Sequence, residues 1–170
     1  MTRLTLTLAR TLPLMLALAT PATAQIEARF IESAPKDTFS FVNSGCALGE
    51  TELVLDMKDS AGGLIFDTEG GGAGVEVFQP FEAISGAVAS VEVTDGAGAL
   101  TLVVPDWPEG GEVSFTIDVD DVLRHGERGQ TQVSGSEIAG AALFVTVAGE
   151  RALGSFDNTN RAVVRGLCVS

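Results

Sequence analysis

The chain has no Tyr and a single Trp among its 170 residues, so its aromatic inventory for a carbohydrate-binding platform is thin. Positive charge is also scarce, since 10 Lys and Arg stand against 23 Asp and Glu and the formal net charge is −13. Because neutralising phosphates requires clustered Lys and Arg, we expect no nucleic-acid partner. The acidity fits either solubility in an extracellular or salty medium or the binding of cations.

Long hydrophobic runs are missing after the first two dozen residues. No later stretch approaches the ~18 to 20 uncharged residues that a bilayer span needs, so we expect no membrane span. Residues 1–24 have the pattern of a secretory signal peptide. Arg3 and Arg10 are their only charges, the apolar run is Leu12–Ala19, and Ala22-Thr23-Ala24 is a small-x-small cleavage pattern. We therefore predict a mature domain of residues 25–170 that is secreted or periplasmic.

Helical periodicity is nearly absent from residue 26 onward, and an apolar pattern of period two takes its place. Frequent Gly, Asp, Asn and Pro divide this pattern into short segments, as turns between antiparallel strands do. The sequence predicts an all-β fold, a single antiparallel β-sandwich of the Ig-like or Greek-key type with about ten short strands. The expected strands are 26–32, 37–43, 52–57, 74–78, 88–94, 100–104, 112–119, 131–137, 142–148 and 162–169.

Alternation is clearest over Glu112–Val119. Val113, Phe115, Ile117 and Val119 should face the core, whereas Ser114, Thr116 and Asp118 should face solvent, because successive side chains of a strand point to opposite faces.

Cys46 and Cys168 are the only cysteines. In an oxidising compartment an even pair most simply forms one disulfide, which would tie an early strand to the last one. Closing so long a loop would contribute about 4 to 5 kcal/mol in the chain-entropy model. A catalytic Cys with a His base has little support, since nothing in the sequence brings the single His125 near either Cys.

The densest carboxylate cluster closes the clearest strand. Asp118, Asp120 and Asp121 are candidate ligands for calcium, a hard ion that prefers oxygen donors, and Asp67 and Glu69 are weaker candidates from another loop. The plain alternative is a solvated strand end. No EF-hand loop is present, and Gly71–Val77 matches only one copy of the repeated nonapeptide of calcium-binding β-rolls, so it is better interpreted as a glycine loop.

A secreted hydrolase is the alternative enzymatic interpretation, with His125 as its base. The Gly-x-Ser-x-Gly elbow is missing, and the nearest phrase, Ser134-Gly135-Ser136, has no helix after it. His125 stands in a polar turn, where an exposed His is ordinary. The sequence therefore favours a protein that is not an enzyme.

Three aromatic residues in loops are candidate binding residues. Trp107, between Pro105 and Pro108, is either an exposed contact or a loop plug. Phe78 and Phe81 flank Gln79-Pro80 and are either a binding pair or a packing anchor. None of the three decides the function.

Three segment pairs carry a resemblance to a known group of proteins: Arg29-Phe30 with Ala34–Asp37, Gly63–Asp67 with Gly74–Phe81, and Phe115–Asp121 with Val133–Ala141. In these segments the chain resembles small secreted bacterial proteins, mostly of marine alphaproteobacteria, that carry the label aggregation factor core. The resemblance implies a secreted, calcium-tolerant adhesion or matrix module, and it transfers no site residue.

We therefore expect a non-catalytic binding, adhesion or extracellular-matrix module, assisted by calcium, whose partner is a protein or an extracellular polymer. Two alternatives stay open. One is the secreted hydrolase that uses His125, and the other is an acidic structural protein with no specific ligand.

Overall fold

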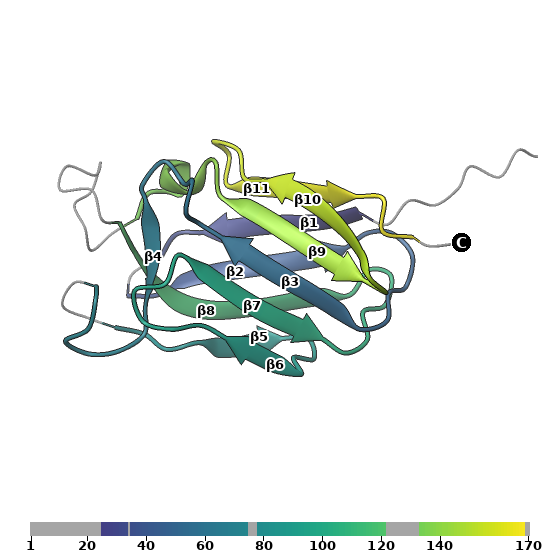
Figure 1. The fold of residues 1–170 in the computed structure, drawn as a ribbon, viewed down its shortest axis with the longest axis horizontal. Coiled ribbons are helices and arrows are strands. Elements are labelled where there is room, and N and C mark those ends of the chain that lie inside the picture. Colours follow the sequence, from purple (N-terminus) through teal and green to yellow (C-terminus); the bar gives the residue numbers. More distant parts are fainter. Residues whose placement is uncertain (1–24, 34, 75–77, 122–132, 169–170) are drawn as a thin grey trace, which may run out of the picture.

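The computed structural model describes residues 25–33, 35–74, 78–121 and 133–168, which form two antiparallel sheets packed face to face (Figure 1). The first sheet has the order β11-β1-β2-β8-β4, with β5 also paired to β8, and the second has the order β10-β9-β3-β7-β6. The predicted antiparallel β-sandwich is confirmed. Neighbours that are distant in sequence, such as β2 and β8, reflect chain crossings of the kind found in Greek-key sandwiches.

The bounds of the elements are β1 Gln25–Ile31, β2 Asp37–Asn43, β3 Thr51–Asp56, β4 Leu64–Asp67, β5 Glu82–Ser85, β6 Ser90–Glu92, β7 Ala99–Val104, β8 Glu112–Asp121, the 3₁₀ turn η1 Gly135–Ile138, β9 Ala142–Val147, β10 Glu150–Ser155 and β11 Arg161–Arg165. In the described ranges, no helix is long and apolar enough to cross a bilayer. The predicted signal peptide, residues 1–24, lies outside the described residues.

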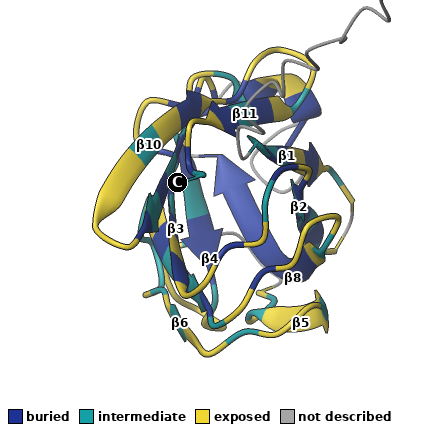
Figure 2. Cartoon of the chain, turned by 90° about the vertical axis from the view of Figure 1, so that its right-hand side faces the viewer, coloured by how far each residue is buried: buried dark blue, intermediate teal, exposed yellow. Residues whose placement is uncertain are grey.

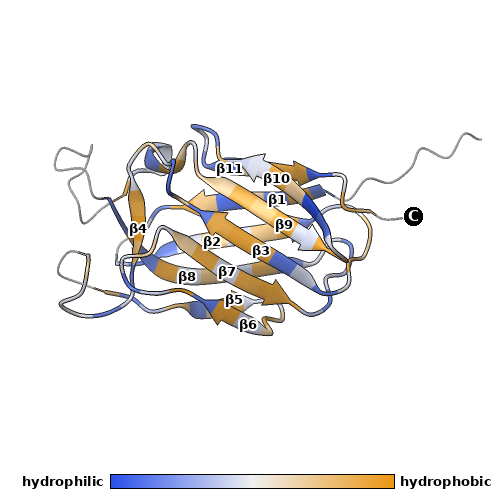
Figure 3. Ribbon diagram, in the orientation of Figure 1, coloured by the Kyte–Doolittle hydropathy of each residue, from blue (hydrophilic) through white to orange (hydrophobic). Residues whose placement is uncertain are grey.

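The core between the sheets is built from the inward positions of the alternating strands (Figures 2 and 3). Phe39 of β2 and Phe115 of β8 stand opposite each other in the register, with ring centroids 5.4 Å apart. Leu53 of β3 stands opposite both Leu102 of β7 and Val145 of β9. All of these side chains are at most 1% exposed, and the prediction that Phe115 of β8 faces the core is confirmed.

The prediction that Ser114, Thr116 and Asp118 face solvent is wrong. They are 5%, 7% and 6% exposed, as buried as the apolar side chains on the other face of β8. β8 pairs with β2 along one edge and with β5 and then β4 along the other. The outer face of β8 is therefore polar and buried.

Three strands were missing from the prediction because their alternation is hidden. In β10 an inward position is Gly154, which packs against the backbone of β11 and leaves no room for a side chain. β5 has no buried residue, and β4 has only four residues. Conversely, the prediction of a strand at 131–137 is wrong for residues 133–137, the part of it that the structure describes. There, Ser134 and Glu137 form the capping box of η1, and the Ser134 backbone N–H donates to the Glu137 carboxylate.

One end of the sandwich is closed by a disulfide and a buried Trp. Cys46 and Cys168 are bonded, with their Cα atoms 6.0 Å apart and a sequence separation of 122 residues. Trp107 forms a backbone bridge with Leu48, and its indole N–H donates to the Gly111 carbonyl at 2.9 Å. Asn43, fully buried, donates to the carbonyls of Cys46 and Trp107. The polar groups of this end therefore have partners.

Removal of the disulfide, as in Cys46→Ser with Cys168→Ser, should lower the free energy of unfolding by up to about 4 to 5 kcal/mol, because the unfolded chain regains the freedom of a long loop. Urea unfolding of the variant and of the parent measures the difference. A reducing agent should lower the midpoint of the parent and leave that of the variant unchanged. An equal midpoint for both proteins would show that the bond adds no stability.

Candidate functional site

The end of the sandwich away from Trp107 gathers carboxyl groups, and strand register explains why. β4 runs antiparallel to the last residues of β8, so that Asp67 is the direct cross-strand partner of Asp118, and Ile65 that of Asp120 (Figure 1). Asp118 and Asp120 are two residues apart and share the outer face of β8 with their neighbour Asp67. All three residues are at most 6% exposed.

A fourth carboxylate, Asp95, fastens the glycine-rich turn above this face. Its Oδ1 accepts hydrogen bonds from the backbone N–H groups of Thr68 and Glu69 at 2.9 and 3.2 Å, and its Oδ2 accepts one from Ala73 at 2.7 Å. These backbone donors hold the pKa of Asp95 below its ordinary value. Asp95 therefore remains a carboxylate and draws the turn against β4.

Asp67 stands at the centre of the group. Its carboxyl is in hydrogen-bonding contact with those of Asp95 and Asp120. Gly74 comes so close that a Cβ there would stand 2.1 Å from Oδ2 of Asp67 and 2.4 Å from Oδ2 of Asp120, so only glycine fits. Two carboxylates repel each other unless a proton or a cation lies between them, and burial followed by the Asp95 charge raises the pKa of Asp67.

Several buried oxygens of this face have no hydrogen-bond partner among the described residues. They are Oδ1 of Asp67, Oδ2 of Asp118 and Oγ1 of Thr116, two positions before Asp118 on β8. An unsatisfied buried polar atom costs about 1 to 3 kcal/mol, and more when it is charged. The unpartnered oxygens of Asp67 and Asp118 come from facing positions of paired strands, so they belong to neighbouring side chains.

Asp37, the first residue of β2, brings a fifth carboxyl to the same end. It is 3% exposed and accepts a hydrogen bond from the Ser33 backbone N–H at 3.0 Å. Burial is the main cause that raises its pKa to about 7, with a smaller contribution from the charges of Asp118 and Asp120. Burial and the charges of Asp120 and Asp67 likewise raise the pKa of Asp118 to about 7.

The carboxylates predicted as ligands separate into two groups. Asp118, Asp120 and the weaker candidate Asp67 lie together. Asp121 is buried but lies on the inward face of β8 with Val119, and Glu69 is exposed beside the turn. Sequence reasoning missed two members, Asp37 and Asp95. The role of Asp95 depends on its contacts with a turn that is distant in sequence, which no local pattern reveals.

The aromatic candidates have different environments. Trp107 is 1% exposed, so it is the loop plug and not an exposed contact. Phe81 packs its ring 4.8 Å from that of Phe115, which makes it an anchor. Phe78 is 41% exposed and its ring lies against Gly70. His125, the base of the alternative hydrolase, lies outside the described residues.

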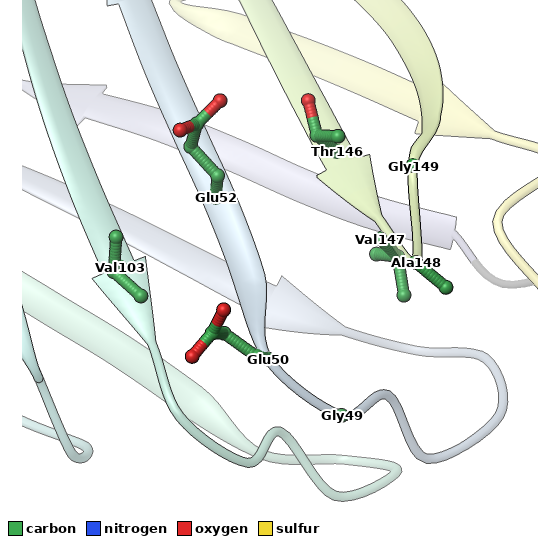
Figure 4. A pocket seen from close by; sticks show the side chains of 8 residues that line it. All are labelled: Gly49, Glu50, Glu52, Val103, Thr146, Val147, Ala148 and Gly149. Carbon is green, nitrogen blue, oxygen red and sulfur yellow. The ribbon is translucent and has the colours of Figure 1, made fainter.

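A second feature is the uncovered outer face of the second sheet. Strand register aligns Leu153 of β10, Phe144 of β9 and Val54 of β3 in one row. Leu153 is 60% exposed, and the guanidinium of Arg151 lies 4.0 Å from the centroid of the Phe144 ring. Toward the end nearest Trp107 the face has an open depression of about 530 Å³ (Figure 4). It is lined by Gly49, Glu50, Glu52, Val103, Thr146 and Val147 and by the turn residues Ala148 and Gly149.

Within the described residues, no three His, Cys, Asp or Glu side chains stand ready-made as a set of metal ligands. The carboxyls of the acidic end make pairwise contacts instead. Comparison with family models, with curated proteins and with solved structures finds no match to this chain. What the protein does must therefore be argued from its own geometry.

The raised pKa values of Asp37 and Asp118 predict an unusual dependence of stability on pH. Each carboxyl has a folded-state pKa of about 7 against an ordinary value of 3.8, so the folded state binds more protons between these values. Their contribution to stability is fully present below about pH 4 and is lost as the pH rises toward 7. In the presence of chelator, the urea midpoint should be higher at pH 5 than at pH 8.

The Asp37→Asn variant keeps a neutral side chain of the same shape, so its midpoint should change less between these two pH values. A midpoint that rises from pH 5 to pH 8 in the parent protein would contradict the prediction.

Proposed function

We propose that this chain is an exported, non-catalytic binding module, of the adhesion or extracellular-matrix kind, whose partner is a protein or an extracellular polymer. The observation that carries the proposal is the outer face of the second sheet, which leaves an apolar row uncovered beside an open depression. Calcium at the opposite end would assist by stiffening the domain without entering the contact with the partner.

The composition of this face supports contact with a macromolecule. Leu153 projects from β10, the edge strand of the second sheet, and Phe144 beside it is only partly buried under Arg151. Interfaces are enriched in aromatic residues and Arg, with an apolar centre and a polar rim. Glu52 and Thr146 supply such a rim, since they face each other across β3 and β9.

Export has independent support. The pattern of residues 1–24 is that of a signal peptide, and the Cys46–Cys168 bond suits an oxidising compartment. The resemblance to aggregation factor core proteins points the same way. The secreted or periplasmic location remains part of the proposal.

The test measures binding to three immobilised probes: a second copy of the chain, a neutral polysaccharide and an acidic polysaccharide. Leu153→Glu should weaken binding about tenfold or more, because it introduces a charge into the apolar row, and tenfold corresponds to about 1.4 kcal/mol. Ile84→Glu is the matched control, because Ile84 is 59% exposed on β5 of the other sheet.

The proposal fails if the parent protein binds none of the three probes, or if the two variants bind alike. Turnover of ester or glycoside substrates by the parent protein, lost in His125→Ala, would favour the hydrolase instead.

A further inference from the structure

The acidic end holds five carboxyl groups that the proposed binding face does not use. Asp37, Asp67 and Asp118 are between 3% and 6% exposed, and Asp95 and Asp120 complete the group. Burying an isolated carboxylate is costly, so such groups are neutralised or paired with cations. The ion pairs of Lys36 with Glu82 and of Arg161 with Glu27 involve none of these five residues.

Two features at this end point to a ligand. The first is the pair of unpartnered oxygens, Oδ1 of Asp67 and Oδ2 of Asp118, which belong to facing residues of β4 and β8. Facing side chains of paired strands have Cβ atoms about 4.5 to 5.5 Å apart, so rotations of the carboxyl groups suffice to bring both oxygens to one ion.

The second feature is the contact of Asp67 with the carboxyls of Asp95 and Asp120. Carboxylates this close repel one another, and a cation lying among them would remove that repulsion. The close approach of Gly74 leaves the carboxyls of Asp67 and Asp120 side by side, in an arrangement that a side chain at position 74 would destroy.

We infer that Asp67 and Asp118, supported by Asp95 and Asp120, bind one divalent cation at the end of β4 and β8, and that this cation is calcium. The donors at this site are all oxygens, which excludes the soft-ligand metals as the natural occupants. Calcium accepts six to eight oxygens in irregular geometry and completes its shell with backbone carbonyls and water, whereas magnesium demands a near-ideal octahedron. Because the carboxyls are not arranged as three ready-made ligands, the cluster suits calcium, which tolerates irregular coordination, better than magnesium.

This site differs from the one that the sequence predicted. Asp121 leaves the ligand set, because it lies on the inward face of β8, and Asp67 becomes its centre. It deepens the calcium-assisted part of the proposed function, on which it rests, and the site lies at the other end of the sandwich from the open depression.

The test is thermal unfolding of the purified chain in calcium, in magnesium and in chelator, combined with titration calorimetry. Calcium at ~100 times its dissociation constant should raise the midpoint by roughly 5 to 10 °C, and magnesium by less. Calorimetry in two buffers of different ionisation enthalpy should show that calcium binding releases protons, because the ion replaces the protons shared by the carboxyls.

Asp67→Asn and Asp118→Asn give a signature that a misfolded variant could not produce. Each variant relieves repulsion among the carboxyls, so its midpoint in chelator should equal or exceed that of the parent protein, while the rise on adding calcium should vanish. Asp106→Asn, which removes the same charge from an exposed loop near Trp107, should keep the full calcium response.

No calcium-dependent rise and no calorimetric signal in the parent protein would overturn the inference and leave protons as the occupants of the cluster. A calcium response that survives in both Asp67→Asn and Asp118→Asn would overturn it as well, because the effect would then be general charge screening. Binding to the immobilised probes is measured separately with Leu153→Glu. The proposal of an ion site and the proposal of a binding face can therefore be rejected independently of each other.

Discussion

The burial of β8 on both faces and along both edges is the constraint on which the rest of the structure depends. β2 pairs with one edge, β5 and β4 share the other, and nine consecutive residues from Val113 to Asp121 are buried. The inward face supplies Phe115 and Ile117 to the core, as an ordinary sandwich strand does. On the outer face the hydroxyls and carboxyls are buried as well, with β4 beside them in the sheet and the turn held by Asp95 next to Asp67.

The two ends of the sandwich differ in how their buried polar groups are accommodated. At the Trp107 end, Asn43 uses both its amide nitrogen and its carbonyl oxygen, and the indole N–H has a carbonyl acceptor. A disulfide beside them adds a constraint that does not depend on solvent conditions. At the acidic end, Asp67 and Asp118 keep oxygens without partners, so the stability of that end depends on what protons or ions the medium supplies.

Sequence patterns predicted what depends on alternation and missed what depends on pairing. Over Val113–Val119 of β8 the period of two identified the inward side chains, because apolar and polar positions alternate there. β10 was not predicted because Gly154 occupies an inward position, and β5 was not predicted because none of its residues is buried. Asp118 and Asp120 were recognised as a cluster from their spacing. Asp37 and Asp95 reach it through contacts across the fold, which no single segment encodes.

The acidic end cannot be explained as a contribution to stability of the unliganded chain. Replacing its carboxyls by apolar or amide groups would remove both the repulsion and the unsatisfied oxygens, so the cluster costs free energy at neutral pH. We infer that the cluster contributes to the protein only when a ligand is bound to it. An ion that bridges β4 to β8 would join the short strand and the turn of Asp95 to the long strand β8. The domain would then reach full rigidity only in a calcium-containing medium, which fits the exterior far better than the cytoplasm.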